Sequence, residues 1–352
     1  MKVLIVGAGP SGLTAAVELA RRGIIPDVID KKDRLSSLSR AVGIFPATMK
    51  ILEPSGVAKE LENQSVVIQN VKFYKESNLL SKIPINLFSA NFFNIYALAQ
   101  DQTELILSKK FEEYGGTIFY KTELKSLKQD KNKISFKLNN DVRKYDILIG
   151  ADGTKSSVRS FIGVDFQGYE LENFWSIADV YTDTSITNAD FQIFIKKDGI
   201  AAIMIPLEKH RFRIISNTDD ALQEIPLSLP IKEIKRTGKF KISVRQAEQY
   251  SRGNVYLVGD AAHSHSPVGG RGMNLGIADA ADLANRIING DLDGYHMARH
   301  PAGKEIINIT ERGRKIVFSR NTLKKELLFF ALIMIGKSKF LNKLFVKKLL
   351  TI

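Results

Sequence analysis

The chain has 352 residues, of which 44% are hydrophobic, so it can bury a sizeable core and is long enough for about two domains. It contains no cysteine, which excludes structural disulfides, thiolate metal sites and any redox-active dithiol. The formal net charge is +13, but residues 301–352 hold twelve Lys or Arg against three acids, a net of +9. The first 300 residues therefore carry only +4. Since no nucleic-acid-binding module is recognisable, we expect no nucleic-acid partner.

The sequence shows no signal for secretion or for membrane insertion. Lys2 leads straight into a short apolar run that ends in glycines, unlike a signal peptide. The longest apolar run, residues 327–335, has nine residues, whereas a spanning helix needs about 20. We therefore expect a cytoplasmic protein.

The N-terminal residues follow the pattern of a dinucleotide-binding unit. Residues 2–6 predict a buried strand, residues 7–12 read Gly-Ala-Gly-Pro-Ser-Gly, and an Ala- and Leu-rich helix follows. Residues 26–30 predict the next strand, which ends in an acid. This order of strand, GxGxxG, helix, strand and acid is the dinucleotide-binding fingerprint. The plain alternative is a glycine-rich turn that binds no ligand.

Each residue of this motif has a physical role. Gly7 permits the tight turn, Gly9 lets a pyrophosphate approach the backbone, and Gly12 lets the helix pack closely on the strand. The helix N-terminus favours the negative phosphates. Asp30 is placed to accept a hydrogen bond from a ribose hydroxyl and would repel a 2′-phosphate, which favours FAD or NAD.

Two later strands also end at a carboxylate beside a glycine. Residues 145–149 lead into Gly150-Ala-Asp152-Gly153, and residues 255–258 lead into Gly259-Asp260. After Asp260 come a loop with Pro267 and several glycines, and then a helical pattern over residues 273–288. A carboxylate can bind sugar hydroxyls, and a glycine-rich loop before a helix can approach an anion. The motif that begins at Gly259-Asp260 therefore predicts a polar cofactor site.

Plainer interpretations exist for parts of these motifs. An isolated Asp-Gly pair such as Asp152-Gly153 is most often an ordinary turn. The spacing of Asp260, His263 and His265 suggests metal ligands, but histidines in such a loop more often bind backbone groups, so we predict no metal.

Taken together, GAGPSG with Asp30, GADG at 150–153 and GDAAH…PVGGRGMN at 259–274 resemble the single-component FAD-dependent monooxygenases of the para-hydroxybenzoate hydroxylase type. The resemblance spans residues 1–318. The chain departs from the family in having Asp30 where Glu is usual and Arg271 where Gln is more common. Here we expect Arg271 to raise the positive potential near the reduced flavin.

The resemblance implies a set of FAD contacts. Ser11 and Asp30 would bind the pyrophosphate and adenosine ribose, Arg40 and Gln100 the ribityl-pyrophosphate region, and Asp260 the ribityl hydroxyls. Asp152 would support both FAD and the nicotinamide cofactor. The flavin-facing residues would be Pro267, Gly269, Gly270 and Arg271. The motifs and the resemblance together give the cofactor-binding set Gly7, Gly9, Ser11, Gly12, Asp30, Arg40, Gln100, Asp152, Gly153, Asp260, Gly272, Met273 and Asn274.

The fold expected is α/β: a Rossmann-like FAD-binding domain with an inserted antiparallel-sheet substrate domain and a C-terminal helical segment. Alternating apolar runs predict the strands of the second sheet. We assign residues 1–65, 96–165 and 250–295 to the FAD-binding domain, 66–95 and 166–249 to the substrate domain, and 296–352 to C-terminal helices with a basic amphipathic tail.

The function implied is an FAD-dependent monooxygenase. It would use NAD(P)H and O2 to hydroxylate an aromatic, polycyclic or quinone-precursor substrate through a flavin C4a-hydroperoxide. The alternative is an FAD-dependent reductase or dehydrogenase of the same fold that acts on a lipid-like substrate without inserting oxygen. The base that would deprotonate a phenol should lie on the second sheet, but no catalytic residue is identified.

The tail has two interpretations. Lys339, Lys343 and Lys347 recur every four residues, with Leu341, Phe345 and Leu349 offset from them, which predicts a basic amphipathic helix. The interpretation we prefer is a terminal helix packed on the body. The alternative is peripheral contact of residues 324–352 with an anionic membrane, which would suit a lipophilic substrate.

Overall fold

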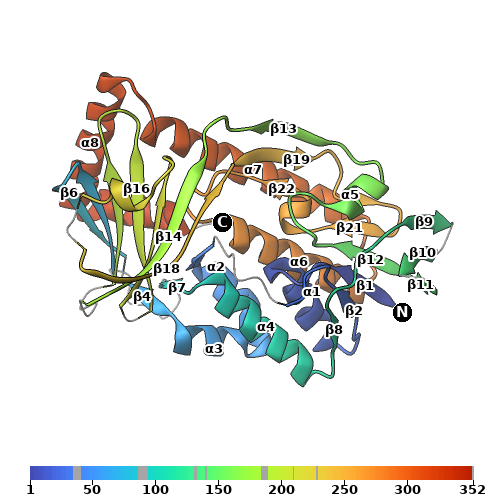
Figure 1. Cartoon of the computed structure of the whole chain (residues 1–352). Coiled ribbons are helices and arrows are strands. Elements are labelled where there is room, and N and C mark those ends of the chain that lie inside the picture. The colour runs from blue at the N-terminus through green and yellow to red at the C-terminus, as the bar shows by residue number, and fades with distance from the viewer. Residues whose placement is uncertain are drawn as a thin grey trace.

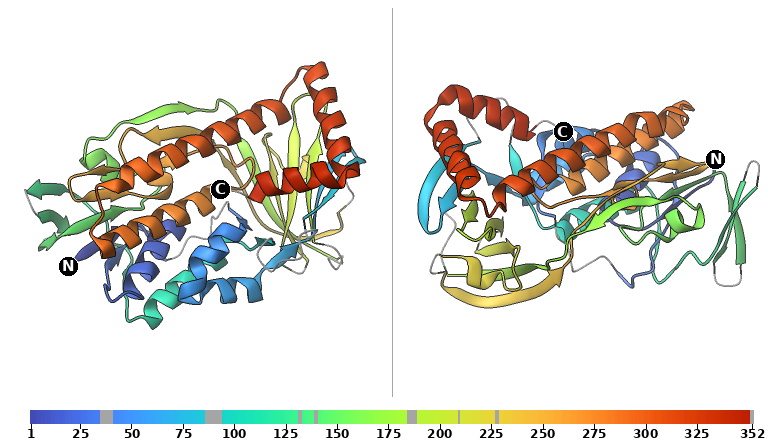
Figure 2. Two further views of the ribbon diagram at one scale, coloured as in Figure 1. Left: turned by 180° about the vertical axis from the view of Figure 1, so that it is seen from behind. Right: turned by 90° about the horizontal axis from the view of Figure 1, so that it is seen from above.

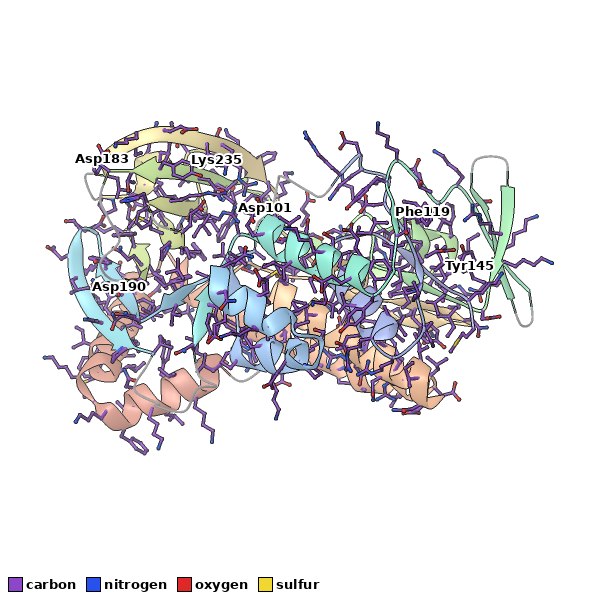
Figure 3. All side chains as sticks on the ribbon, turned by 90° about the horizontal axis from the view of Figure 1, so that it is seen from below. Asp101, Phe119, Tyr145, Asp183, Asp190 and Lys235 are labelled. Carbon is purple, nitrogen blue, oxygen red and sulfur yellow. The ribbon has the colours of Figure 1, made fainter. Side chains whose placement is uncertain are left out.

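The computed structural model describes residues 1–34, 41–85, 94–130, 133–138, 141–183, 189–208, 210–226 and 229–350. Arg40, expected at the FAD site, lies outside these residues. The chain is built around two large sheets (Figure 1). They occupy opposite ends of the molecule, as Asp190 in one and Tyr145 beside the other show (Figure 3).

The first large sheet has six strands in the order β20-β21-β12-β1-β2-β8. Its strands are β1 (Val3–Val6), β2 (Asp27–Ile29), β8 (Ile118–Phe119), β12 (Ile147–Gly150), β20 (Ser251–Arg252) and β21 (Val255–Leu257). All its pairs are parallel except β20 with β21. The four residues of β1 are buried, which explains the continuous apolar run, because a parallel sheet is covered on both faces. Helices α1 (Pro10–Ala20), α4 (Gln100–Glu113) and α6 (Gly272–Asn289) pack together beside this sheet.

Smaller elements accompany the two large sheets. A three-stranded sheet is formed by β3 (Gly43–Ile44), β7 (Ile95–Ala97) and β4 (Val66–Ile68), next to α2 (Pro46–Leu52), a 3₁₀ turn (Glu53–Ser55) and α3 (Val57–Gln64). A meander contains β9 (Leu127–Asp130), β10 (Lys133–Leu138) and β11 (Asp141–Tyr145). Helix α5 (Ser157–Phe161) follows β12, and a last small sheet joins β13 (Phe166–Glu170), β19 (Ser243–Ala247) and β22 (His263–Ser264).

The second large sheet has seven strands in the order β18-β14-β17-β16-β15-β5-β6 and is antiparallel except where β15 pairs with β5. Its strands are β5 (Asn70–Lys75), β6 (Asn78–Pro84), β14 (Trp175–Thr182), β15 (Asp190–Ile195), β16 (Ala201–Glu208), β17 (Arg211–Ser216) and β18 (Ile231–Phe240), and a 3₁₀ turn (Leu222–Glu224) lies between the last two. The expectation of a largely antiparallel second sheet is confirmed. One face carries Ile177 and Ile215, which share an apolar cluster with Val42 and Phe45. This face of the sheet therefore looks toward the segment that contains Val42 and Phe45.

Three helices end the described chain: α7 (Gly294–Val317), α8 (Thr322–Lys337) and α9 (Lys339–Leu350). Figure 2 shows that they lie on one face of the molecule, with α8 and α9 beside the seven-stranded sheet. The Ser81 hydroxyl on β6 donates to the Leu332 carbonyl of α8 at 2.8 Å, and Val346 of α9 is fully buried in the cluster that contains Phe45. The expectation that the tail packs on the body is confirmed. Among the described residues, no helix has the length and apolar character needed to cross a membrane.

Candidate functional site

The three sequence motifs meet at the carboxyl ends of β1, β12 and β21. Gly7 has φ +109°, and a Cβ on it would lie 2.3 Å from the carbonyl oxygen of Ala151. The Ser11 hydroxyl lies 2.3 Å from where a Cβ on Gly259 or on Gly276 would be. The first glycine loop therefore touches both later motifs, in a packing that only glycine permits at these positions.

Two glycines border space that the described protein atoms leave open. A Cβ on Gly9 or on Gly270 would meet no atom within 4 Å, although a Cβ on Gly12 would lie 1.9 Å from the Gly7 carbonyl oxygen. Gly12 is thus required by packing of the helix on the strand. Gly9, at the N-terminus of α1, instead leaves the backbone accessible. An N-terminus with open space beside its backbone fits a diphosphate group.

Asp30 follows β2 and holds the glycine loop. Its Oδ2 accepts from the Ala8 backbone N–H at 2.8 Å and its Oδ1 from the Lys32 N–H at 2.9 Å. A carboxylate has about four acceptor positions, so two remain for ligand hydroxyls. The ribose contact of Asp30 stays a prediction.

The other two carboxylates have different environments. Asp152 accepts from the Ser156 hydroxyl at 2.5 Å, from the Ser157 hydroxyl at 3.1 Å and from the Val158 N–H at 3.1 Å, so it stabilises the start of α5. This is close to the plain turn interpretation, and its cofactor contact stays a prediction. Asp260 is exposed, with the Thr154 hydroxyl 3.4 Å from its Oδ2. That hydrogen bond joins the second and third motifs.

Asn274 holds the loop before α6 in place. Its Oδ1 accepts from the Phe45 N–H at 2.9 Å and the Thr48 hydroxyl at 2.7 Å. Its Nδ2 donates to the carbonyls of Gly43 at 2.9 Å and Gly270 at 3.0 Å. These four bonds use its two donors and both acceptor positions, so only its backbone could contact a cofactor.

The side chain of Arg271 contacts the C-terminal end of α9, which the sequence did not predict. It is 4% exposed, and its Nη2 donates to the carbonyls of Lys348 at 3.2 Å and Leu349 at 3.1 Å. A cation at the C-terminal end of a helix satisfies its last carbonyls. Arg271 thus fixes the end of α9 beside the glycine loop, while the flavin-facing role assigned to it stays a prediction.

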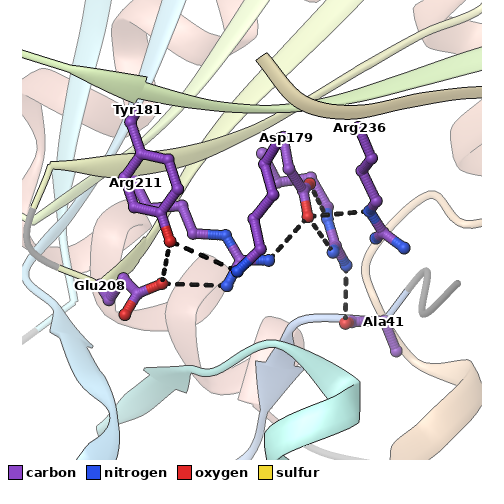
Figure 4. A network of polar contacts seen from close by, with 8 residues as sticks. Ala41, Asp179, Tyr181, Glu208, Arg211 and Arg236 are labelled. Atoms are coloured by element: carbon purple, nitrogen blue, oxygen red, sulfur yellow. Dashed lines mark hydrogen bonds and ion pairs between the residues drawn. The ribbon is translucent and has the colours of Figure 1, made fainter. Parts of the chain in front are cut away.

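A charged network that the sequence did not predict lies on the face of the seven-stranded sheet that looks toward this site (Figure 4). Asp179 is fully buried, and Arg213 binds both of its oxygens, at 2.7 and 2.8 Å. Arg211 and Arg236 reach its Oδ2 at 3.0 and 2.9 Å. Burial acts to raise the pKa of Asp179, but the arginine charges outweigh it and the pKa lies below the usual range.

The network connects the sheet to the segment that carries the predicted FAD contacts. Arg213 Nη1 donates to the Ala41 carbonyl at 3.2 Å, and the Ala41 N–H donates to Gln100 Oε1 at 3.2 Å. Gln100 Nε2 donates to Glu104 at 2.8 Å. The structure therefore places Gln100 beside Ala41, while the FAD contact assigned to Gln100 stays a prediction.

Comparisons with known proteins agree with this geometry. The model of the FAD-binding domain family matches residues 1–310. The chain therefore belongs to the FAD-binding domain family. It is 30% identical over 347 residues to pentachlorophenol 4-monooxygenase of Sphingobium chlorophenolicum, covering 90% of this chain and 64% of that protein. It is 28% identical over 335 residues to rifampicin monooxygenase of Streptomyces venezuelae, covering 88% and 70%.

A solved structure shows the fold of the family member. The p-nitrophenol 4-monooxygenase of Pseudomonas putida superposes with a TM-score of 0.90 at 20% identity, over 99% of this chain and 98% of that chain. The predicted fold class is therefore confirmed: a Rossmann-like FAD-binding unit, an antiparallel sheet and C-terminal helices. The chain spans about two thirds of the length of pentachlorophenol 4-monooxygenase, 64%.

Two buried side chains, His263 and Asp279, and the half-buried Arg299 support the third sequence motif. His263 Nε2 lies 2.5 Å from Asp279 Oδ2, and Arg299 Nε donates to Asp279 Oδ1 at 2.8 Å. The Gly259 N–H donates to the same carboxylate at 3.2 Å. Burial acts to raise the pKa of Asp279, but His263 and Arg299 outweigh it and lower the pKa.

His263 and His265 each have a protein partner at one ring nitrogen. His265 Nδ1 lies 2.8 Å from the Ser266 carbonyl oxygen, and the described residues contain no cluster of three or more side chains suited to a metal ion. The sequence reasoning missed Asp279, although it lies in the predicted helix, among the apolar residues of its buried side. An acid on the buried side of an amphipathic helix is the signal that could have identified it.

Proposed function

We propose that the protein is an FAD-dependent monooxygenase that uses NAD(P)H and O2 to hydroxylate an aromatic or polycyclic substrate. The observation that carries the proposal is the convergence of Gly9, the Asp152 loop and Asp260 at the carboxyl ends of three adjacent parallel strands. This edge is where ligands bind in open α/β sheets. The open space beside Gly9 and Gly270 fits a cofactor with a diphosphate and a planar ring.

Bound FAD would supply hydride acceptance and oxygen activation, and the protein would hold it and exclude side reactions. Asp260, exposed at the strand end, would bind ribityl hydroxyls. The start of α6, an 18-residue helix, would place free N–H groups near the negative charge of a reduced flavin, which stabilises it by about 0.3–1 kcal/mol. Asn274 would keep those N–H groups in position, because its side chain joins Gly270 to α2 and β3.

The substrate would lie between the flavin loop and the seven-stranded sheet. The apolar cluster there includes Phe45, Ile205, Ile215 and Val346, which suits an aromatic ring system and excludes water. Relatives named for pentachlorophenol and rifampicin support a substrate of the aromatic or polycyclic class. The network around Asp179 would be the polar border of this region. A quinone precursor remains within the proposed class.

The test separates hydroxylation from reduction without oxygen insertion. The purified yellow protein is screened with phenols and polycyclic aromatics for faster oxidation of NADH or NADPH, and the product is analysed after reaction under ¹⁸O-labelled O2. We expect one labelled oxygen atom in the product. Substrate-dependent NAD(P)H oxidation that yields an unlabelled product would favour the reductase or dehydrogenase alternative. A colourless protein that cannot be reconstituted with FAD would overturn both.

A further inference from the structure

The outer surface of α8 and α9 carries an apolar stripe. Its six side chains, which we call the α8–α9 outer face, are Leu323 (71% exposed), Leu327 (60%), Phe330 (63%), Met334 (40%), Phe340 (75%) and Leu344 (57%). They are six of the nineteen large hydrophobic side chains that are exposed among the described residues, although the two helices contain only 28 residues. Such a concentration marks an interaction surface.

The spacing of these residues places them in one row on each helix. Positions 323, 327, 330 and 334 are separated by four, three and four residues, so they share one side of α8, and 340 and 344 share one side of α9. Both helices lie on the same face of the molecule (Figure 2). Their opposite sides hold Phe329, Leu332, Val346 and Leu350 in the core. Helix α8 is therefore apolar on both sides, which is unusual for a helix that faces water.

After Glu326, the charged side chains around the α8–α9 outer face are all positive. Exposed lysines flank it at positions 324, 337, 339, 343, 347 and 348, and residues 327–352 contain no acid. Protein–protein interfaces are depleted in lysine. Helices that lie on anionic lipid instead combine exposed Leu and Phe with neighbouring Lys, whose long side chains reach the headgroups. The chemistry of this face therefore matches lipid better than protein.

We propose that the α8–α9 outer face docks on an anionic phospholipid surface, with both helices lying along it. The helices insert their exposed Leu, Phe and Met side chains, and the lysines bind the headgroups. No described helix could cross the bilayer, which agrees with surface attachment. The inner side of the same helices borders the apolar cluster with Phe45, so docking would bring the substrate region within about one helix diameter, 10–12 Å, of the lipid. Only this last consequence rests on the proposed function.

The experiment is flotation of the FAD-loaded full chain with vesicles. Vesicles of phosphatidylcholine and phosphatidylglycerol in equal parts should carry the protein upward, and those of phosphatidylcholine alone should carry far less. Each lysine near the surface contributes roughly fivefold in affinity, so K343Q and K347Q together should weaken binding to anionic vesicles about 25-fold. Flavin absorbance and circular dichroism report the fold of each variant, and the binding result does not depend on catalytic turnover.

Apolar variants separate lipid insertion from simple charge attraction. The double variant L327E/F330E should lose flotation at least tenfold, because two side chains that would be buried in lipid become charged. Met297→Glu is the matched control: Met297 is 73% exposed on α7, outside the outer face, and its change should leave flotation unaltered. The proposal is overturned if the wild-type chain does not float, or if L327E/F330E floats as well as it does. Light scattering that shows a wild-type dimer dissociated by L327E/F330E, with no flotation, would assign the face to a second copy of the chain.

Discussion

Replacing Gly9 with alanine separates FAD binding from folding. Gly9 has φ −82° and ψ −179°, which alanine adopts readily, and its Cβ would touch no described atom within 4 Å. The apoprotein should keep its stability or gain about 0.4–1 kcal/mol, because alanine restricts the unfolded chain. The same methyl group would occupy the space assigned to the FAD diphosphate. Loss of one charge-assisted hydrogen bond costs about 1.5–3 kcal/mol, so FAD should bind about 10- to 150-fold more weakly.

The assay is titration of apoprotein with FAD, followed by flavin fluorescence, beside thermal denaturation of the apoprotein. Gly238→Ala is the matched control: Gly238 lies on β18 and its Cβ would make an ordinary 3.6 Å contact with Ile177. The apoprotein should again keep its stability or gain about 0.4–1 kcal/mol, but FAD affinity should stay unchanged. Gly12→Ala should show the opposite pattern and destabilise the apoprotein, because its Cβ would lie 1.9 Å from the Gly7 carbonyl oxygen. Wild-type FAD affinity in folded Gly9→Ala protein would refute the assignment of the diphosphate site.

Three further predictions concern buried charges. Asp179→Asn removes the counter-charge of the buried Arg213 and should lower the free energy of unfolding, measured in urea, by about 3–5 kcal/mol. In the control Asp183→Asn, the carboxylate that is lost is half-exposed and paired with Lys232, so the free energy of unfolding should fall by less than about 1 kcal/mol. Burial lowers the pKa of His265, so the unfolded state takes up the proton first. The melting temperature should therefore fall as the pH drops below about 6.5, and an equal fall in His265→Asn would contradict this cause. Arg271→Met should speed amide exchange in α9 about tenfold or more by removing its bonds to the Lys348 and Leu349 carbonyls, and the exposed control Lys347→Met should not.

The parts of the site that depend on local backbone geometry could be predicted from the sequence. Gly7 and Gly12 are required within a few residues of each other, because a strand, a tight turn and a helix start leave no room for a Cβ. The alternative for Asp152 was equally local, since its partners are four to six residues away. The roles of the two glycines and the turn at Asp152 were both predicted from sequence spacing alone. Spacing predicts contacts well when the residues in contact are neighbours in the chain.

The parts that depend on tertiary contacts could not be predicted in this way. The position of Arg271 in the motif gave no sign of its hydrogen-bond partners, which lie 77 and 78 residues further along the chain. The partners of Asp179 are 32 to 57 residues away on strands that happen to pair with it. An alternating strand pattern shows which side of a strand is buried, but not which strand lies next to it. The arginine partners of a buried carboxylate such as Asp179 can therefore be identified only once the pairing of the strands is known.

The protein's own interior determines the shape of the proposed FAD site. Asp279 on α6 holds the Gly259 turn, His263 and Arg299 of α7 at once, although none of these bonds requires a ligand. Asn274, one turn earlier, fixes the glycine loop to α2 and β3 with its whole hydrogen-bonding capacity. Both residues are buried, so their bonds compete little with water. We therefore expect the loop and the start of α6 to be ordered before any cofactor arrives, so that ordering them does not reduce FAD affinity.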